Sequence, residues 1–137
     1  MNRALSALSA LALLTGGASS SAAGEAQAFA GDYRMQGRGF APQDSPYEGR
    51  CTLRGDGPNY DVSCFNADTR HTYVGRGLAS GDGLAIFIGD TLRGDHRALF
   101  VGEYLILYRR TGDGTLEGTW LDMQGRAAGR ETLTPMR

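Results

Sequence analysis

Apolar and polar residues alternate in short runs from residue 29 onward, and turn-forming residues separate these runs about every ten positions. The clearest turn signals are glycine–aspartate clusters at 55–57, 81–83, 94–95 and 112–114. No run keeps the i, i+3, i+4, i+7 apolar spacing that marks an amphipathic helix. We therefore predict eight strands, at about 31–38, 46–54, 60–66, 70–80, 84–90, 97–108, 115–122 and 126–134.

Short strands at regular spacing are typical of an antiparallel sandwich or barrel. Closing eight strands into an up-and-down barrel removes the exposed edges of the sheet. We therefore expect an all-β fold, an eight-stranded antiparallel up-and-down barrel, whose interior has room for packed side chains or for one small ligand.

The strands on either side of the turn at 55–59 can be registered from the sequence. Placing Cys51 opposite Cys64 gives one apolar and one polar face, and a slip of one residue would mix the two faces. The same register pairs Leu53 with Val62, Thr52 with Ser63 and Arg54 with Asp61. We expect opposite charges to attract in the last of these pairs.

A second hairpin turns at 112–114, where Gly114 suits the left-handed position of a three-residue loop. This turn pairs Arg109 with Glu117, Tyr108 with Gly118, and Ile106 with Trp120. It predicts one apolar face, made of Tyr104, Ile106, Tyr108, Leu116 and Trp120.

Aromatic side chains with polar tips either line a pocket or fill a core. The candidate ligand-binding residues are Tyr33, Tyr73, Tyr104, Tyr108 and Trp120. Both alternatives stay open for them. A short echo, Tyr47-Glu48-Gly49 and Tyr73-Val74-Gly75, is interpreted as glycines that let bent strands coil into a barrel.

The first 23 residues have the pattern of a signal peptide. Arg3 precedes an apolar run over 4–14, and small residues follow it. The run is too short for a permanent membrane anchor. We predict cleavage after Ala23, which leaves a single domain over 24–137 in the periplasm or outside the cell. Cleavage after Ala28 is the alternative. No later segment is apolar enough to span a membrane.

Two cysteines in an exported chain predict a disulfide, Cys51–Cys64. Their spacing is neither Cys-x-x-Cys nor a zinc pattern, and the two histidines, His71 and His96, are poorly placed for a four-ligand site. We expect no metal.

Composition excludes several functions. The net charge is −1, so no basic field points to nucleic acid. The chain has no lysine, which excludes a lysine Schiff base and a phosphate-binding P-loop. No Gly-x-Ser-x-Gly elbow is present. We expect no cofactor.

The start of the first predicted strand, Phe29-Ala30-Gly31-Asp32-Tyr33, resembles the opening strand of calycin barrels, the lipocalin and avidin group. Further segments resemble a family of small exported proteobacterial β-barrels, largely uncharacterised and sometimes labelled fibronectin-binding. They are Tyr47-Glu48-Gly49, Asn59-Tyr60-Asp61-Val62, Tyr73-Val74-Gly75-Arg76-Gly77, Gly83-Leu84-Ala85-Ile86 and Asp113-Gly114-Thr115-Leu116-Glu117-Gly118-Thr119-Trp120. The resemblance implies a calycin-like barrel; the two cysteines depart from the family, whose matching positions resemble valine and tryptophan.

We expect an exported, non-enzymatic barrel that binds a small apolar ligand or an extracytoplasmic protein partner. One alternative is a periplasmic inhibitor of a protease or lysozyme, which would insert an N-terminal arm, residues 24–30, into an enzyme cleft. Another is a barrel enzyme acting on a lipid-like substrate, which needs a closed pocket with one buried carboxylate or one polar group that holds water. Glu103 is the candidate carboxylate. An empty interior of several hundred Å3 would favour a binder.

Overall fold

The computed structural model describes residues 29–40, 44–55, 58–94, 97–122 and 124–137, with the side chains of 89–103 excluded. The predicted signal peptide and both cleavage sites lie outside the described residues. No helix in the described part of the chain is long and apolar enough to cross a membrane.

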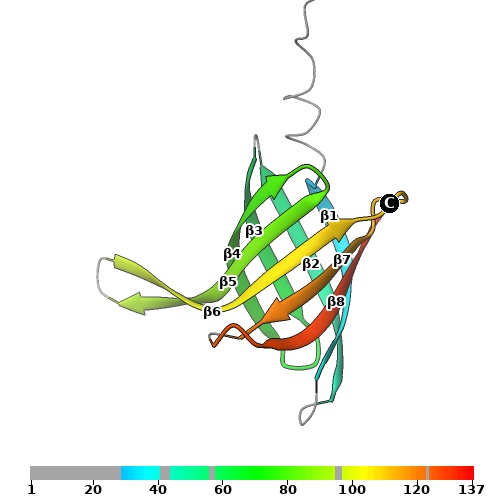
Figure 1. Cartoon of the computed structure of the whole chain (residues 1–137). Coiled ribbons are helices and arrows are strands. Elements are labelled where there is room, and N and C mark those ends of the chain that lie inside the picture. The colour runs from blue at the N-terminus through cyan, green and yellow to red at the C-terminus, as the bar shows by residue number, and fades with distance from the viewer. Residues whose placement is uncertain (1–28, 41–43, 56–57, 95–96, 123) are drawn as a thin grey trace, which may run out of the picture.

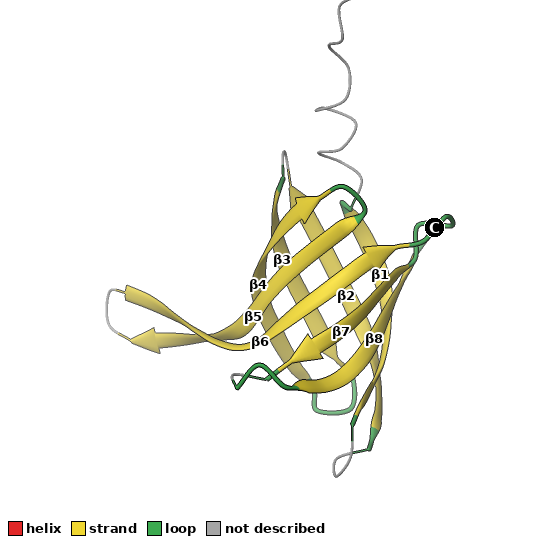
Figure 2. Ribbon diagram, viewed as in Figure 1, coloured by secondary structure: helices red, strands yellow, loops and turns green. Residues whose placement is uncertain are grey.

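Eight antiparallel strands form a closed barrel in sequence order, so the predicted fold class is confirmed (Figure 1). The strands are β1 (Gly31–Gly39), β2 (Pro46–Gly55), β3 (Asn59–Asn66), β4 (His71–Ser80), β5 (Gly83–Gly94), β6 (Arg97–Arg110), β7 (Leu116–Leu121) and β8 (Ala127–Pro135). Each strand pairs with its neighbours in the chain, and β1 closes the barrel against β8 (Figure 2).

Both predicted hairpin registers are confirmed. Cys51 lies opposite Cys64 and Leu53 opposite Val62 in the β2–β3 pair. In the β6–β7 pair, Tyr108 lies opposite Gly118 and Ile106 opposite Trp120. Residues at alternate positions of β3 are buried, which is the period expected of a strand with one face toward a core.

The expected attraction between Arg54 and Asp61 is not what the structure shows, although the two residues are opposite in register. Arg54 donates to Asp32 of β1 at 3.1 Å, and Asp61 bonds to Arg76 of β4. Each strand of a closed barrel has two neighbours, so an exposed charged side chain can form an ion pair with a residue of either neighbouring strand. The hairpin alone could not reveal the second neighbour.

The β5–β6 hairpin is longer than predicted, because β5 runs to Gly94 rather than to about residue 90. Pairing of β4 with β5 ends at Val74 opposite Gly89, and pairing of β6 with β7 ends at Leu105 opposite Leu121. Beyond these points β5 and β6 pair only with each other, and their hairpin projects from the side of the barrel (Figure 1).

One end of the barrel, here called the closed end, is filled by side chains from Phe29, Tyr33, Leu53, Tyr60, Leu84, Leu116 and Leu133. The rings of Phe29 and Tyr60 meet edge to face, 5.9 Å apart. The Tyr33 hydroxyl donates to the carbonyl oxygen of Phe29 at 2.9 Å, and the Arg110 guanidinium lies 5.1 Å from the centre of the Phe29 ring. These contacts anchor the start of the described chain across this end.

Three aromatic rings inside the barrel lie directly over glycines of a neighbouring strand. The pairs are Tyr47 over Gly37, Tyr108 over Gly118, and Trp120 over Gly129. A Cβ atom at any of these glycines would overlap the ring. Glycine is therefore required at these positions for close approach, a known device in sheets.

Substituting Gly129 with alanine should displace the Trp120 ring and lower the free energy of unfolding by about 1–3 kcal/mol, the usual effect of overpacking. Gly112→Ala is the matched control, because a Cβ there meets no atom within 4 Å. Urea unfolding monitored by circular dichroism measures both variants. Equal stability of the two would show that the Trp120 ring does not depend on Gly129.

Candidate functional site

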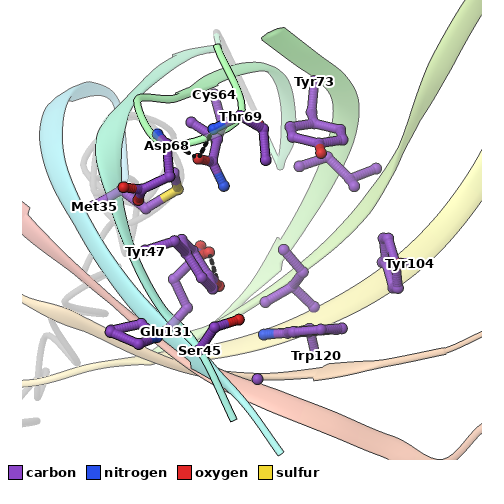
Figure 3. A pocket seen from close by; sticks show the side chains of 15 residues that line it. Met35, Ser45, Tyr47, Cys64, Asp68, Thr69, Tyr73, Tyr104, Trp120 and Glu131 are labelled. Atoms are coloured by element: carbon purple, nitrogen blue, oxygen red, sulfur yellow. Dashed lines mark hydrogen bonds between the residues drawn. The ribbon is translucent and has the colours of Figure 1, made fainter. Parts of the chain in front are cut away.

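The end of the barrel opposite the closed end, here called the open end, contains a cavity of about 380 Å3 (Figure 3). Residues around the end of β1, the start of β2 and the β3–β4 turn surround its mouth, and inward residues of the strands form its walls. It is lined by Met35, Gly39, Ser45, Pro46, Tyr47, Cys64, Asn66, Asp68, Thr69, Tyr73, Ile88, Tyr104, Ile106, Trp120 and Glu131.

Three of the predicted aromatic residues line the cavity: Tyr73, Tyr104 and Trp120. The rings of Tyr104 and Trp120 meet edge to face at 5.0 Å. In the view of Figure 3 these three side chains lie on one side, with Tyr47 and Glu131 across from them. The cavity therefore presents aromatic surface on more than one wall.

The other two predicted residues, Tyr33 and Tyr108, are buried and are not among the lining residues. Tyr33 belongs to the closed end, and the Tyr108 hydroxyl reaches the carboxylate of Glu131. Both side chains point into the barrel. The alternation of residues along a strand predicts which side chains point inward, but not how far along the barrel axis they lie. Depth along the barrel axis depends on strand tilt and on which residues fill the closed end.

Tyr47 lines the cavity, although the sequence did not single it out as a ligand residue. Its one signal was the echo with Tyr73, and both tyrosines of that echo lie in the cavity wall. The close strand contacts agree with the interpretation of the echo through its glycines. Added Cβ atoms at Gly49 and Gly75 would meet backbone carbonyl oxygens of the next strand.

Glu131 of β8 is a second lining residue that the sequence did not single out. It is 6% exposed and lines the cavity. The Tyr47 hydroxyl donates to its Oε2 at 2.7 Å, and the Tyr108 hydroxyl donates to its Oε1. Glu131 lies opposite Gly37 and Gly118, the two glycines over which these tyrosine rings lie. Because these glycines have no side chain, the two tyrosine rings can lie over them, and both hydroxyls can reach the Glu131 carboxylate.

Burial raises the pKa of Glu131, and the hydrogen bonds from Tyr108 and Tyr47 lower it, with a net rise. Burial, and then the nearby Glu131 carboxylate, raise the pKa of both tyrosines. The tyrosines are therefore neutral donors at physiological pH. Glu103, the acid that the sequence favoured, belongs to β6, and its side chain lies outside the described residues.

The indole nitrogen of Trp120 is a buried polar atom beside the cavity. The indole N–H lies near enough to the Tyr47 hydroxyl to lower the pKa of Tyr47, but without hydrogen-bond geometry. Nε1 is buried and has no acceptor among the described residues. Trp120 is half-buried and faces the same interior as Ile106 and Tyr108, as predicted from the hairpin.

The predicted disulfide is confirmed and forms part of the cavity wall. The Sγ atoms of Cys51 and Cys64 are 2.04 Å apart and the Cα atoms 4.0 Å apart. Cys64 lines the cavity, and the Sγ atom of Cys51 lies 3.5 Å from the Met35 sulfur. The bridge therefore stabilises the β2–β3 wall beside the site.

The fold and the cavity define a class: a closed eight-stranded antiparallel barrel with one filled end and one open, aromatic-lined end. No protein-family model matches the chain, and a search of curated proteins finds no similar sequence. Within the described residues, no group of three or more histidine, cysteine, aspartate or glutamate side chains is placed to hold a metal ion.

Proposed function

We propose that this protein is an extracytoplasmic, non-enzymatic barrel that binds a small, largely apolar ligand in the cavity at its open end. The single observation that carries the proposal is the cavity itself. Its volume of about 380 Å3 is within the range of small-molecule sites, which are typically about 300–1,000 Å3. Its wall is mostly apolar and aromatic, with few polar groups, as in such sites.

Two further features support the compartment and the kinship. Disulfides persist in oxidising compartments outside the cytoplasm. The Cys51–Cys64 disulfide therefore supports an extracytoplasmic location. The Gly31-Asp32-Tyr33 motif begins β1 of a closed eight-stranded barrel. The resemblance to calycin barrels predicts the motif at this position, the opening strand. Both features support the proposal that the chain is one of the exported calycin-like barrels.

The inhibitor alternative receives less support. Phe29, which belongs to the predicted arm, is buried at the closed end against Tyr60 and beneath the Arg110 guanidinium. An arm anchored at this residue cannot enter an enzyme cleft as a whole. Residues 24–28 lie outside the described residues.

Binding can be tested through Trp120, which is the only tryptophan of the chain and lines the cavity. Titration with the neutral probes 2-phenylethanol and 1-octanol should change the Trp120 emission in a saturable way, because a ligand in the cavity replaces water next to the indole ring. Isothermal titration calorimetry checks the affinity independently of fluorescence.

Neighbouring residues of β6 give a matched control for this titration. Ile106 points into the cavity, whereas Leu107 is 50% exposed on the outer face. Ile106→Phe should weaken binding about tenfold, or ~1.4 kcal/mol, by narrowing the cavity, and Leu107→Phe should leave it unchanged. If neither probe binds, or if both variants bind like wild type, the cavity is not the site.

Glu131 gives a specific reason to keep one alternative, the barrel enzyme acting on a lipid-like substrate. A buried carboxylate beside an apolar cavity, with a raised pKa, is suited to general acid or base catalysis. Incubation with the methyl ester of an unsaturated fatty-acid epoxide, which carries no charge, separates the two functions. A binder returns the probe unchanged, whereas an enzyme converts it and loses that conversion in Glu131→Gln.

A further inference from the structure

We propose that the ligand carries a protonated amine attached to an apolar or aromatic body, and that the amine binds against the Glu131 carboxylate. This inference rests on the proposed function, because it names the class of ligand that the same cavity accepts. Four observations support it: the uncharged partners of Glu131, the charges around the cavity, the aromatic walls, and the pKa of the carboxylate.

Glu131 has two hydrogen-bond donors from the protein, and both are uncharged. They are the hydroxyls of Tyr47 and Tyr108, and no positive charge acts on the carboxylate in the described part of the chain. Two neutral donors offset only part of the cost of burying a carboxylate, which is normally met by an ion pair. A cation in the cavity would supply the missing charge.

The other lining residues favour a cation as well. Two carboxylates line the cavity, Glu131 and Asp68, whereas the described lining contains no arginine or histidine. The chain has no lysine. A cleft with one sign of charge and low-dielectric walls concentrates ligands of the opposite charge. An anionic ligand such as a fatty acid would be repelled by the same carboxylates.

The aromatic residues suit both parts of such a ligand. Ring faces attract cations, and the attraction is larger where water is excluded. Tyr47 is next to Glu131, while Tyr73, Tyr104 and Trp120 line the remainder of the cavity (Figure 3). The ammonium group would therefore lie at the Glu131 side, and the apolar body would contact Tyr104 and Trp120.

The pKa of Glu131 agrees with this placement. Burial raises the pKa of the carboxyl group, so ionisation is costly when nothing positive is near. A bound ammonium lowers the same pKa, because opposite charges stabilise each other. The ligand and the ionised carboxylate therefore favour one another, whereas an alcohol adds a hydrogen bond without compensating the charge.

Three probes with one carbon skeleton test the inference: 2-phenylethylamine, 2-phenylethanol and phenylacetate. At about pH 7 the amine is a cation, the alcohol is neutral and the acid is an anion. Calorimetry should show that the amine binds wild type about 10- to 100-fold more tightly than the alcohol, the range expected for a charged hydrogen bond. Phenylacetate should bind more weakly than the alcohol.

Glu131→Gln should remove the preference for the amine while keeping the affinity for the alcohol. The glutamine amide can bond to both tyrosines, because a hydroxyl donates or accepts, so we expect this variant to fold. Glu117→Gln is the matched control, since it removes the same charge from the exposed face of β7. It should keep the preference.

The outcomes separate the two proposals. If the alcohol binds wild type and the amine binds no more tightly, the inference is wrong and the binding function stands. The same holds if Glu131→Gln keeps the preference for the amine, or if Glu117→Gln loses it. If neither amine nor alcohol binds wild type, the proposed function itself fails, and the inference fails with it. The comparison of probes on wild type needs no variant to fold.

Discussion

Replacing Tyr60 with alanine should lower the free energy of unfolding by about 3–5 kcal/mol, the range for deleting a buried aromatic ring. Tyr60 is 1% exposed and is among the largest fully buried side chains described. Its ring meets Phe29 edge to face, so truncation leaves a void and also frees the segment that covers the closed end. Urea unfolding followed by circular dichroism measures the loss.

Phe65 is the matched control for this substitution. It lies on the same strand, β3, but points outward and is 43% exposed. Phe65→Ala should change stability by no more than about 0.5 kcal/mol, as is usual for surface positions. A Tyr60→Ala variant as stable as Phe65→Ala would mean that the closed end does not support the barrel.

Removing the disulfide should lower stability by about 3 kcal/mol. The bridge joins residues 13 positions apart, and the entropy of closing a loop of this length gives roughly that value. The barrel should still form, because the β2–β3 register is also fixed by six other opposed residue pairs, among them the inward Leu53 and Val62. Cys51→Ala/Cys64→Ala tests this by thermal and urea unfolding.

A reducing agent provides the control for the cysteine variant. It should lower the Tm of the wild type toward that of Cys51→Ala/Cys64→Ala, and leave the Tm of the double variant unchanged. If the reductant lowers both equally, its effect does not act through the bridge. Circular dichroism spectra of the double variant should retain the β signature of the wild type, and loss of that signature would contradict the expectation that the barrel forms without the sulfurs.

The sequence predicted the features of this fold that depend on local order. Gly112-Asp113-Gly114 forms the turn that positions Ile106 opposite Trp120, and Gly114 adopts a positive φ of 84° as expected. Cys51 and Cys64 could be paired because only one register of their hairpin separates apolar from polar residues. Both are properties of neighbouring strands joined by a short turn.

Features that depend on the closed barrel could not be predicted in this way. Tyr33 and Tyr73 both point inward, but one fills the closed end and the other lines the cavity, a difference that strand tilt determines. Glu131 reaches Tyr47 of β2 and Tyr108 of β6, neither on an adjacent strand. The only local sign that Glu131 points inward was its position two residues from Gly129 and from Leu133, on the same face of β8.

The pairing of β1 with β8 also has a consequence for how the chain folds. Every other strand pair is between sequence neighbours, whereas Met35 and Leu133 meet from roughly a hundred positions apart. Loop-closure entropy makes such a contact the slowest to form, so the hairpins can assemble early and leave β1 and β8 as open edges. Those edges are sites for intermolecular strand pairing until β1 and β8 meet. Because the Tyr47–Glu131 hydrogen bond joins β2 to β8 across β1, the cavity wall and the protection against aggregation are completed in the same late step.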